Sequence, residues 1–209
     1  MNRREFILQG LRWGGTLLLG TALSAVLPGS LKAVSEPAAA AAEHNYLLYN
    51  SGLPIVENSF SFDRLRLRPD TERIIIHHSA IGFTDEVTAA DIHRVHHENG
   101  WSGIGYHFYV HKSGLIETGR PLEDAGAHTY RYNNTSLGIC LAGDFTEELP
   151  SDAQMESLAK LTGILCQMYC LKPSEDIVAG HRDFNETACP GEYLYSRLPN
   201  LRESAGRFI

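Results

Sequence analysis

The chain has 209 residues, of which 43% are apolar and 21% are charged, a composition typical of globular rather than disordered or fibrous proteins. Its formal net charge is −7, so it lacks the basic excess of nucleic-acid-binding proteins, and no nucleic-acid partner is expected. Four cysteines are too few for a scaffold built from disulfides, which means that the fold depends on a hydrophobic core.

The N-terminal segment differs in kind from the rest of the chain. Residues 1–12 are basic and residues 13–31 are uncharged, the order of the n-region and h-region of an export signal. A membrane-spanning helix is the alternative, but the stretch is rich in glycine. Arg3-Arg4 followed by Phe6-Ile7 resembles the twin-arginine motif. We therefore expect residues 1–33 to be a signal peptide, cleaved there or as late as about residue 42, and the twin-arginine translocase to export the protein to the periplasm or cell envelope.

After this segment, strand patterns alternate with helix signals. Thr88 and Asp91 form a capping-box pattern for a helix that ends at Gly100, and Ser151 with Gln154 predicts a second, longer helix. Strands are expected at residues 73–77, 104–111, 115–117, 136–142 and 177–179, of which the second and third form a hairpin. This alternation predicts an α/β fold, a mixed central β-sheet flanked by helices.

The ten histidines offer one local candidate for a metal site. His93 and His97 are four residues apart on the first predicted helix, as in the H-E-x-x-H metalloproteases. The sequence between them lacks the glutamate that serves as general base in those enzymes. Solvated helix histidines are therefore the better interpretation.

A second candidate site is assembled from distant parts of the sequence. His77 ends the strand at residues 73–77, and the segment 180–191 contains His181 and Cys189. Strand ends and the loops after them are where α/β folds place their chemistry, and a catalytic zinc needs about three ligands from His, Cys or carboxylate groups. On spacing alone, a purely structural role for His77 stays open.

Several motifs occur in the order found in one known family. They are Ile75-Ile76-His77-His78-Ser79-Ala80, Gly100-Trp101 with Ile104-Gly105-Tyr106-His107-Phe108, Gly126-Ala127-His128 with Tyr132-Asn133, Ser136-Leu137-Gly138-Ile139, and Gly180-His181-Arg182 with Cys189-Pro190-Gly191. Together they resemble the zinc amidases related to T7 lysozyme and the peptidoglycan recognition proteins. The resemblance implies hydrolysis of the amide bond between the lactyl group of N-acetylmuramic acid and L-alanine, with peptidoglycan or muropeptides as substrate.

The extent of this resemblance sets the expected organisation of the chain. One amidase domain covers residues 70–200, preceded by a linker and lead-in at 34–69 and followed by a C-terminal tail at 201–209. A monomer is expected.

Carried over by position, the resemblance makes His77, His181 and Cys189 the ligands of one zinc ion. His78 is the less favoured neighbour because successive side chains of a strand point to opposite faces. Tyr106 matches the catalytic tyrosine of the family, and Thr187 occupies a position that is lysine in T7 lysozyme and threonine in many catalytic recognition proteins.

The remaining roles are less specific. Tyr106 acting through water is one hypothesis for the general base, with Glu123 and Glu186 as weaker candidates. The resemblance places His128 and Asn133 in the segment that lines the peptide groove.

Trp101 is a further candidate substrate contact. The alternatives are a core position for Trp101 and a simple turn at Asn133. Arg120 also matches a family pattern, although a structural salt bridge explains it equally well.

The other cysteines have structural interpretations. Cys140 lies in an apolar strand and is expected to be buried as a small hydrophobe. Cys166 and Cys170 are four residues apart, where a disulfide is possible but packing is favoured.

Three functions compete at this point. The leading one is an exported, zinc-dependent N-acetylmuramoyl-L-alanine amidase. The alternative is a non-catalytic peptidoglycan sensor on the same fold, a class whose members commonly lack the cysteine ligand. A zinc peptidase that acts on another exported amide shares the metal chemistry and differs only in substrate.

Overall fold

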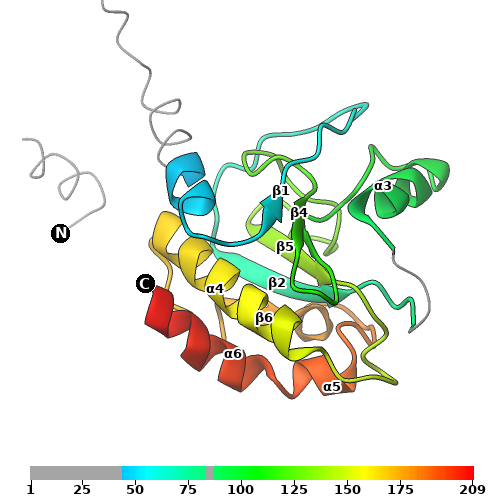
Figure 1. Ribbon diagram of the computed structural model, residues 1–209. Coiled ribbons are helices and arrows are strands. Elements are labelled where there is room, and N and C mark those ends of the chain that lie inside the picture. Colours follow the sequence, from blue (N-terminus) through cyan, green and yellow to red (C-terminus); the bar gives the residue numbers. More distant parts are fainter. Residues whose placement is uncertain (1–43, 83–86) are drawn as a thin grey trace, which may run out of the picture. The chain divides into compact units, whose positions relative to one another are not determined.

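Within the part of the chain that the structure describes, residues 44–82 and 87–209 of a computed structural model, six strands form one mixed sheet (Figure 1). The strand order is β1-β4-β3-β5-β2-β6, and only the β3–β4 pair is antiparallel. The strands are β1 Ile55–Val56, β2 Arg73–His78, β3 Phe108–Val110, β4 Ile116–Thr118, β5 Ser136–Leu141 and β6 Val178–Gly180. The expected signal peptide lies outside the described residues.

Helices cover both faces of this sheet (Figure 1). They are α3 Ala89–Glu98, α4 Asp152–Met168, α5 Glu192–Tyr195 and α6 Leu198–Ala205, with the 3₁₀ turns η1 His181–Asp183 and η2 Gly206–Phe208. The large core cluster joins one face of the sheet to α4 and α6. A smaller cluster joins the other face to α3.

Strand β2 shows why the sheet is covered on both sides. Ile74, Ile75 and Ile76 are all 0% exposed, and a run of apolar residues without alternation is typical of a strand buried on both faces. Ile74 and Ile76 belong to the large cluster with α4 and α6. Successive side chains of a strand point to opposite faces of the sheet, so His77 and His78 face opposite sides.

The structure confirms the predicted fold class and most of the predicted elements. Both capping boxes are present, with Thr88 as N-cap of α3 and Ser151 as N-cap of α4. The strand predicted at residues 104–111 is shorter and begins at Phe108. Ile104 and Gly105 hydrogen-bond to histidine side chains instead of to a neighbouring strand.

Some elements had no counterpart in the sequence analysis. Within the lead-in, residues 44–49 are helical and β1 pairs with β4, and Leu48 is almost fully buried in the large cluster. Near the C-terminus, α6 packs on α4 and extends into the segment expected to be a tail. Among the described residues, no helix has both the length and the apolar character needed to cross a membrane.

The packing interpretation is confirmed for Cys140 and Cys166 and is wrong for Cys170. All four cysteines are free; Cys140 and Cys166 are buried, whereas Cys170 is exposed. No disulfide therefore joins Cys166 to Cys170.

The N-cap of α4 gives a test of the fold. The Ser151 hydroxyl accepts a hydrogen bond from the Gln154 backbone N–H and donates one to the Lys112 carbonyl. We expect Ser151→Ala to lower the free energy of unfolding by about 1–2 kcal/mol because both bonds are lost. Urea denaturation followed by circular dichroism measures the change. Ser151→Thr keeps the hydroxyl and serves as the control; equal stability of the alanine variant and the wild type contradicts the assignment.

Candidate metal centre

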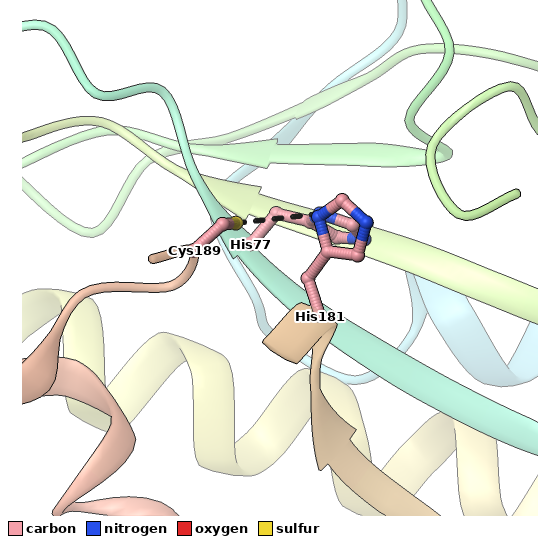
Figure 2. A group of neighbouring side chains, drawn as sticks. All are labelled: His77, His181 and Cys189. Carbon is pink, nitrogen blue, oxygen red and sulfur yellow. Dashed lines mark hydrogen bonds between the residues drawn. The ribbon is translucent and has the colours of Figure 1, made fainter. Parts of the chain in front are cut away.

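Three potential metal ligands from distant parts of the chain meet at one point (Figure 2). His77 is the penultimate residue of β2, His181 begins η1 directly after β6, and Cys189 lies in the loop that follows. One ligand atom from each lies within 4.8 Å of the other two. Elsewhere in residues 44–82 and 87–209, no comparable group of three His, Cys or carboxylate side chains occurs.

The cluster fits a tetrahedral zinc ion in both chemistry and size. Imidazole nitrogen and thiolate sulfur are preferred zinc ligands, and Zn–N and Zn–S bonds of about 2.0–2.3 Å place nitrogen and sulfur about 3.5 Å apart. The distance between His77 Nδ1 and Cys189 Sγ is 3.6 Å. Three protein ligands leave a fourth position for water or substrate, as in catalytic zinc sites.

The side chain of Asn185, which the sequence did not point to, orients His181. The Nε2 atom of His181 lies 3.1 Å from Asn185 Oδ1, and the same oxygen accepts a hydrogen bond from the Tyr130 backbone N–H. Because this oxygen accepts from both groups, His181 carries its proton on Nε2, and Nδ1 is the nitrogen that can bind a metal. The signal in the sequence was the spacing of four residues between His181 and Asn185 across a tight turn.

His77 is oriented from behind by His128. His77 Nε2 lies 3.0 Å from His128 Nδ1 and 3.4 Å from the Thr129 hydroxyl, while its other ring nitrogen faces Cys189. His128 is itself buried, and its Nε2 has no hydrogen-bond partner among the described residues. Partners of this kind fix the tautomer and orientation of metal-binding histidines.

Asn133 shapes the turn that carries His128. Its side-chain oxygen accepts hydrogen bonds from the backbone N–H groups of His128 (2.8 Å) and Thr129 (2.9 Å). Asn133 therefore has a structural role whether or not it also contacts substrate.

Burial keeps this cluster uncharged in the absence of a cation. It lowers the pKa of His77 well below the usual value, and the neighbouring His128 and His181 lower it further. Burial also raises the pKa of the Cys189 thiol to about 11, and it lowers that of His128 to about 3. Neutral imidazoles are the form that binds metals, whereas a thiol with so high a pKa ionises at neutral pH only when a cation is bound.

Tyr106 and Thr187 each lie next to one of the three candidate ligands. The ring centroids of Tyr106 and His77 are 5.1 Å apart. Burial, followed by the nearby thiols of Cys140 and Cys189, raises the pKa of Tyr106 well above its usual value. Thr187 is exposed, and its hydroxyl oxygen accepts a hydrogen bond from the Cys189 backbone N–H at 3.2 Å.

An open groove of about 470 Å³ runs from Tyr106 along α3. Trp101 lines it and is 45% exposed, so it is a surface residue and not part of the core. Glu123 lines a separate cavity of about 300 Å³, and Glu186 is exposed in the loop before Cys189.

The remaining sequence candidates have structural partners. His78 faces away from His77, accepts a hydrogen bond from the Phe145 backbone N–H and lies near Asp144. Among the described residues, the Arg120 guanidinium donates to backbone carbonyls and to no carboxylate, which does not support the salt-bridge alternative. Within residues 44–82 and 87–209, His93 and His97 belong to no metal cluster. The expected solvation is wrong for His93, whose Nδ1 accepts a hydrogen bond from the Ile104 N–H.

The profile of the N-acetylmuramoyl-L-alanine amidase family matches residues 67–192, more than half of the chain. The chain belongs to this amidase family. The resemblance inferred from the motifs is thereby confirmed.

Relatives of the amidase domain include enzymes and recognition proteins. The endolysin of Escherichia phage T7 is 32% identical over 132 residues, which cover 61% of this chain and 85% of the endolysin. The amidase LysC from Clostridium intestinale superposes with a TM-score of 0.64 at 32% identity, over 70% of this chain and 95% of LysC. Drosophila PGRP-LB gives a TM-score of 0.62 at 27% identity, over 69% and 91% of the two chains, and a mutant of that protein has been solved in complex with tracheal cytotoxin.

The contact between His181 and Asn185 gives a test of the metal centre. We expect Asn185→Leu to weaken zinc binding by about 10–100-fold because His181 loses the acceptor that orients it. Competition with a chromophoric chelator measures the affinity. Asn185→Asp retains the acceptor and should bind zinc at least as well as the leucine variant; equal affinities for wild type and Asn185→Leu would refute the role.

Proposed function

We propose that the protein is a zinc-dependent N-acetylmuramoyl-L-alanine amidase that hydrolyses the bond between the lactyl group of N-acetylmuramic acid and L-alanine. The observation that carries this proposal is the convergence of His77, His181 and Cys189 next to Tyr106 in a member of the amidase family. The groove supports this proposal, because an extended substrate bound in it would lie against Tyr106.

The ligand set accounts for the metal chemistry. His77 and His181 bind one zinc ion as neutral imidazoles and Cys189 binds it as a thiolate. A zinc ion in such a site polarises a carbonyl group and lowers the pKa of a water molecule towards neutrality. Asn185 and His128 hold the two imidazoles in the orientation that binding requires.

Tyr106 acts as a hydrogen-bond donor in this scheme. A phenol with a raised pKa keeps its proton at neutral pH, so it is a poor base but a good donor to the oxygen that gains negative charge during hydrolysis. Thr187 uses its oxygen to accept from the Cys189 N–H, and its hydroxyl proton can be donated to the substrate.

We propose three substrate contacts around this centre. Trp101 presents an exposed ring in the groove, suited to packing against sugar or peptide. The Asn133 side-chain nitrogen can donate to the peptide because its oxygen is already bonded to the backbone. His128, which is 8% exposed and lies next to His77, is the third proposed contact.

The proposed setting is the cell envelope, with the protein acting as a monomer. The basic and then uncharged sequence at residues 1–31, with Arg3-Arg4, supports export through the twin-arginine translocase. Peptidoglycan or its muropeptide fragments are the substrates available there.

Release of stem peptide tests the function directly. We expect purified protein loaded with zinc to release free stem peptide from defined muropeptides, detected by mass spectrometry. Cys189→Ser should lose both zinc and turnover, whereas Cys170→Ser, which changes an exposed thiol, should keep both. Tight muropeptide binding without any release favours the sensor function, and full activity of Cys189→Ser contradicts the ligand assignment.

The role of Tyr106 has its own test. Tyr106→Phe should retain zinc but lose about 2.7–4 kcal/mol of transition-state stabilisation, a fall in kcat of about 10²–10³-fold, because one donor to the developing oxyanion is removed. Steady-state kinetics together with metal analysis measure both quantities. Tyr130→Phe, at a side chain that is 71% exposed, is the matched control. An unchanged kcat in Tyr106→Phe excludes this role.

A further inference from the structure

The backbone just before Tyr106 is bound to histidine side chains of helix α3. His93 Nδ1 accepts a hydrogen bond from the Ile104 N–H at 3.2 Å, and His96 Nδ1 accepts one from the Gly105 N–H at 3.0 Å. These are the two backbone donors that precede Tyr106. The regular strand begins only at Phe108, so α3 takes the place of a partner strand here.

The carbonyl groups of the same segment are also held by contacts outside it. The Arg120 guanidinium donates to the Ile104 carbonyl at 3.0 Å, and the Arg120 backbone N–H donates to the Tyr106 carbonyl at 2.8 Å. The Gly105 carbonyl accepts from the Ala127 N–H at 3.0 Å. The segment is therefore fixed on both its donor and its acceptor sides.

The fit between the helix and this segment is tight. A Cβ atom added to Gly103 would lie 2.4 Å from His93 Cε1, and the backbone there has a φ of +105°, which favours glycine. His93 in turn stacks on Phe60, with ring centroids 4.5 Å apart. His96 packs against Trp101, also at 4.5 Å. Each imidazole is therefore packed against an aromatic ring as well as bonded to the backbone.

Both imidazoles are uncharged near neutral pH, as acceptors must be. Burial and then the charge of Arg120 lower the pKa of His96 to about 4, while a backbone hydrogen bond to Gly103 acts in the opposite direction. The pKa of His93 is lowered by burial, then by His97 and to a lesser degree by Arg120. A backbone hydrogen bond to Ser61 raises it. Because Nδ1 accepts in each case, the proton of each ring is on Nε2.

We propose that His93 and His96 are positioning residues that hold Tyr106 at the metal centre through the backbone of Ile104 and Gly105. The inference rests on the proposed function of Tyr106. A displacement of about 1 Å at a reacting group can cost about 100-fold in rate, so a segment that ends in such a group benefits from being fixed on every side. Neither histidine is one of the three candidate ligands, but His96 also lines the groove beside Trp101, so KM is measured together with kcat.

A first experiment examines this network without reference to catalysis. Long-range ¹H–¹⁵N correlation spectra of the intact protein at pH 7 should show His93 and His96 as neutral Nε2–H tautomers. Hydrogen exchange should show protected amides at Ile104 and Gly105, with loss of protection at Gly105 in His96→Leu. A neutral Nδ1–H tautomer at His96, or an exchange rate at Gly105 that does not respond to His96→Leu, overturns the network.

A second experiment tests whether the network acts through Tyr106. We expect His96→Leu to keep its zinc and its KM while kcat falls by up to about 100-fold. His96→Asn, whose side-chain oxygen replaces Nδ1 as acceptor, should recover most of the rate. Glu98→Leu is the control, because Glu98 is exposed on the same helix and pairs with Arg94 and not with the segment. Failure of the asparagine variant to recover while it remains folded overturns the proposal.

The double variant separates positioning of Tyr106 from other effects. His96→Leu combined with Tyr106→Phe should be no slower than Tyr106→Phe alone, because the histidine then has no phenol left to position. Additive losses would show that His96 does not act through Tyr106 and would refute the proposal. A rise in KM with unchanged kcat would also refute it, because His96 would then act on substrate binding through its contact with Trp101. If the wild-type protein has no amidase activity, the proposed function fails, while the spectra and exchange rates still decide whether the network exists.

Discussion

The parallel pairing of β2 with β5 is the constraint on which the site depends. In this register Ile75 lies beside Gly138 and His77 lies beside Cys140, so the face of β5 next to the candidate ligand carries only small side chains. A Cβ atom on Gly138 would lie 2.6 Å from the His128 ring. Because Gly138 has no side chain, His128 can pack next to His77. A shift of one residue in the register between β2 and β5 would turn His77 towards α4 and α6.

The fold was predictable where local chemistry and periodicity agree. Arg73 to His78 is a β-branched run that could only be a strand buried on both faces, and Thr88 and Ser151 begin helices through bonds made within a single turn. Prediction failed where the stabilising contacts are distant in sequence. Helix α6 is short and is stabilised by packing on α4, and β1 is a two-residue strand that exists because β4 lies beside it.

The candidate ligands could be named from the sequence because their motifs resemble a family, but their surroundings could not. Nothing in the spacing shows that His128 lies behind His77, since this contact spans 51 positions and depends on a glycine in another strand. The histidines of α3 show the same limit. Three histidines within five positions suggested a solvated helix face, whereas His93 and His96 bind the backbone of a segment about ten residues further along the chain.

The two parts of the candidate site are supported by different elements, and this bears on the difference between hydrolysis and recognition. The ligand cluster rests on β2 and on the turn from His181 to Cys189, which Asn185 stabilises. Tyr106 rests on a segment fastened to α3 and to Arg120. Because the groove is formed along α3 and is not lined by the ligand cluster, loss of Cys189 would leave the groove in place. In this chain both supports end within one ring contact of each other, at His77 and Tyr106, as the proposed hydrolysis requires.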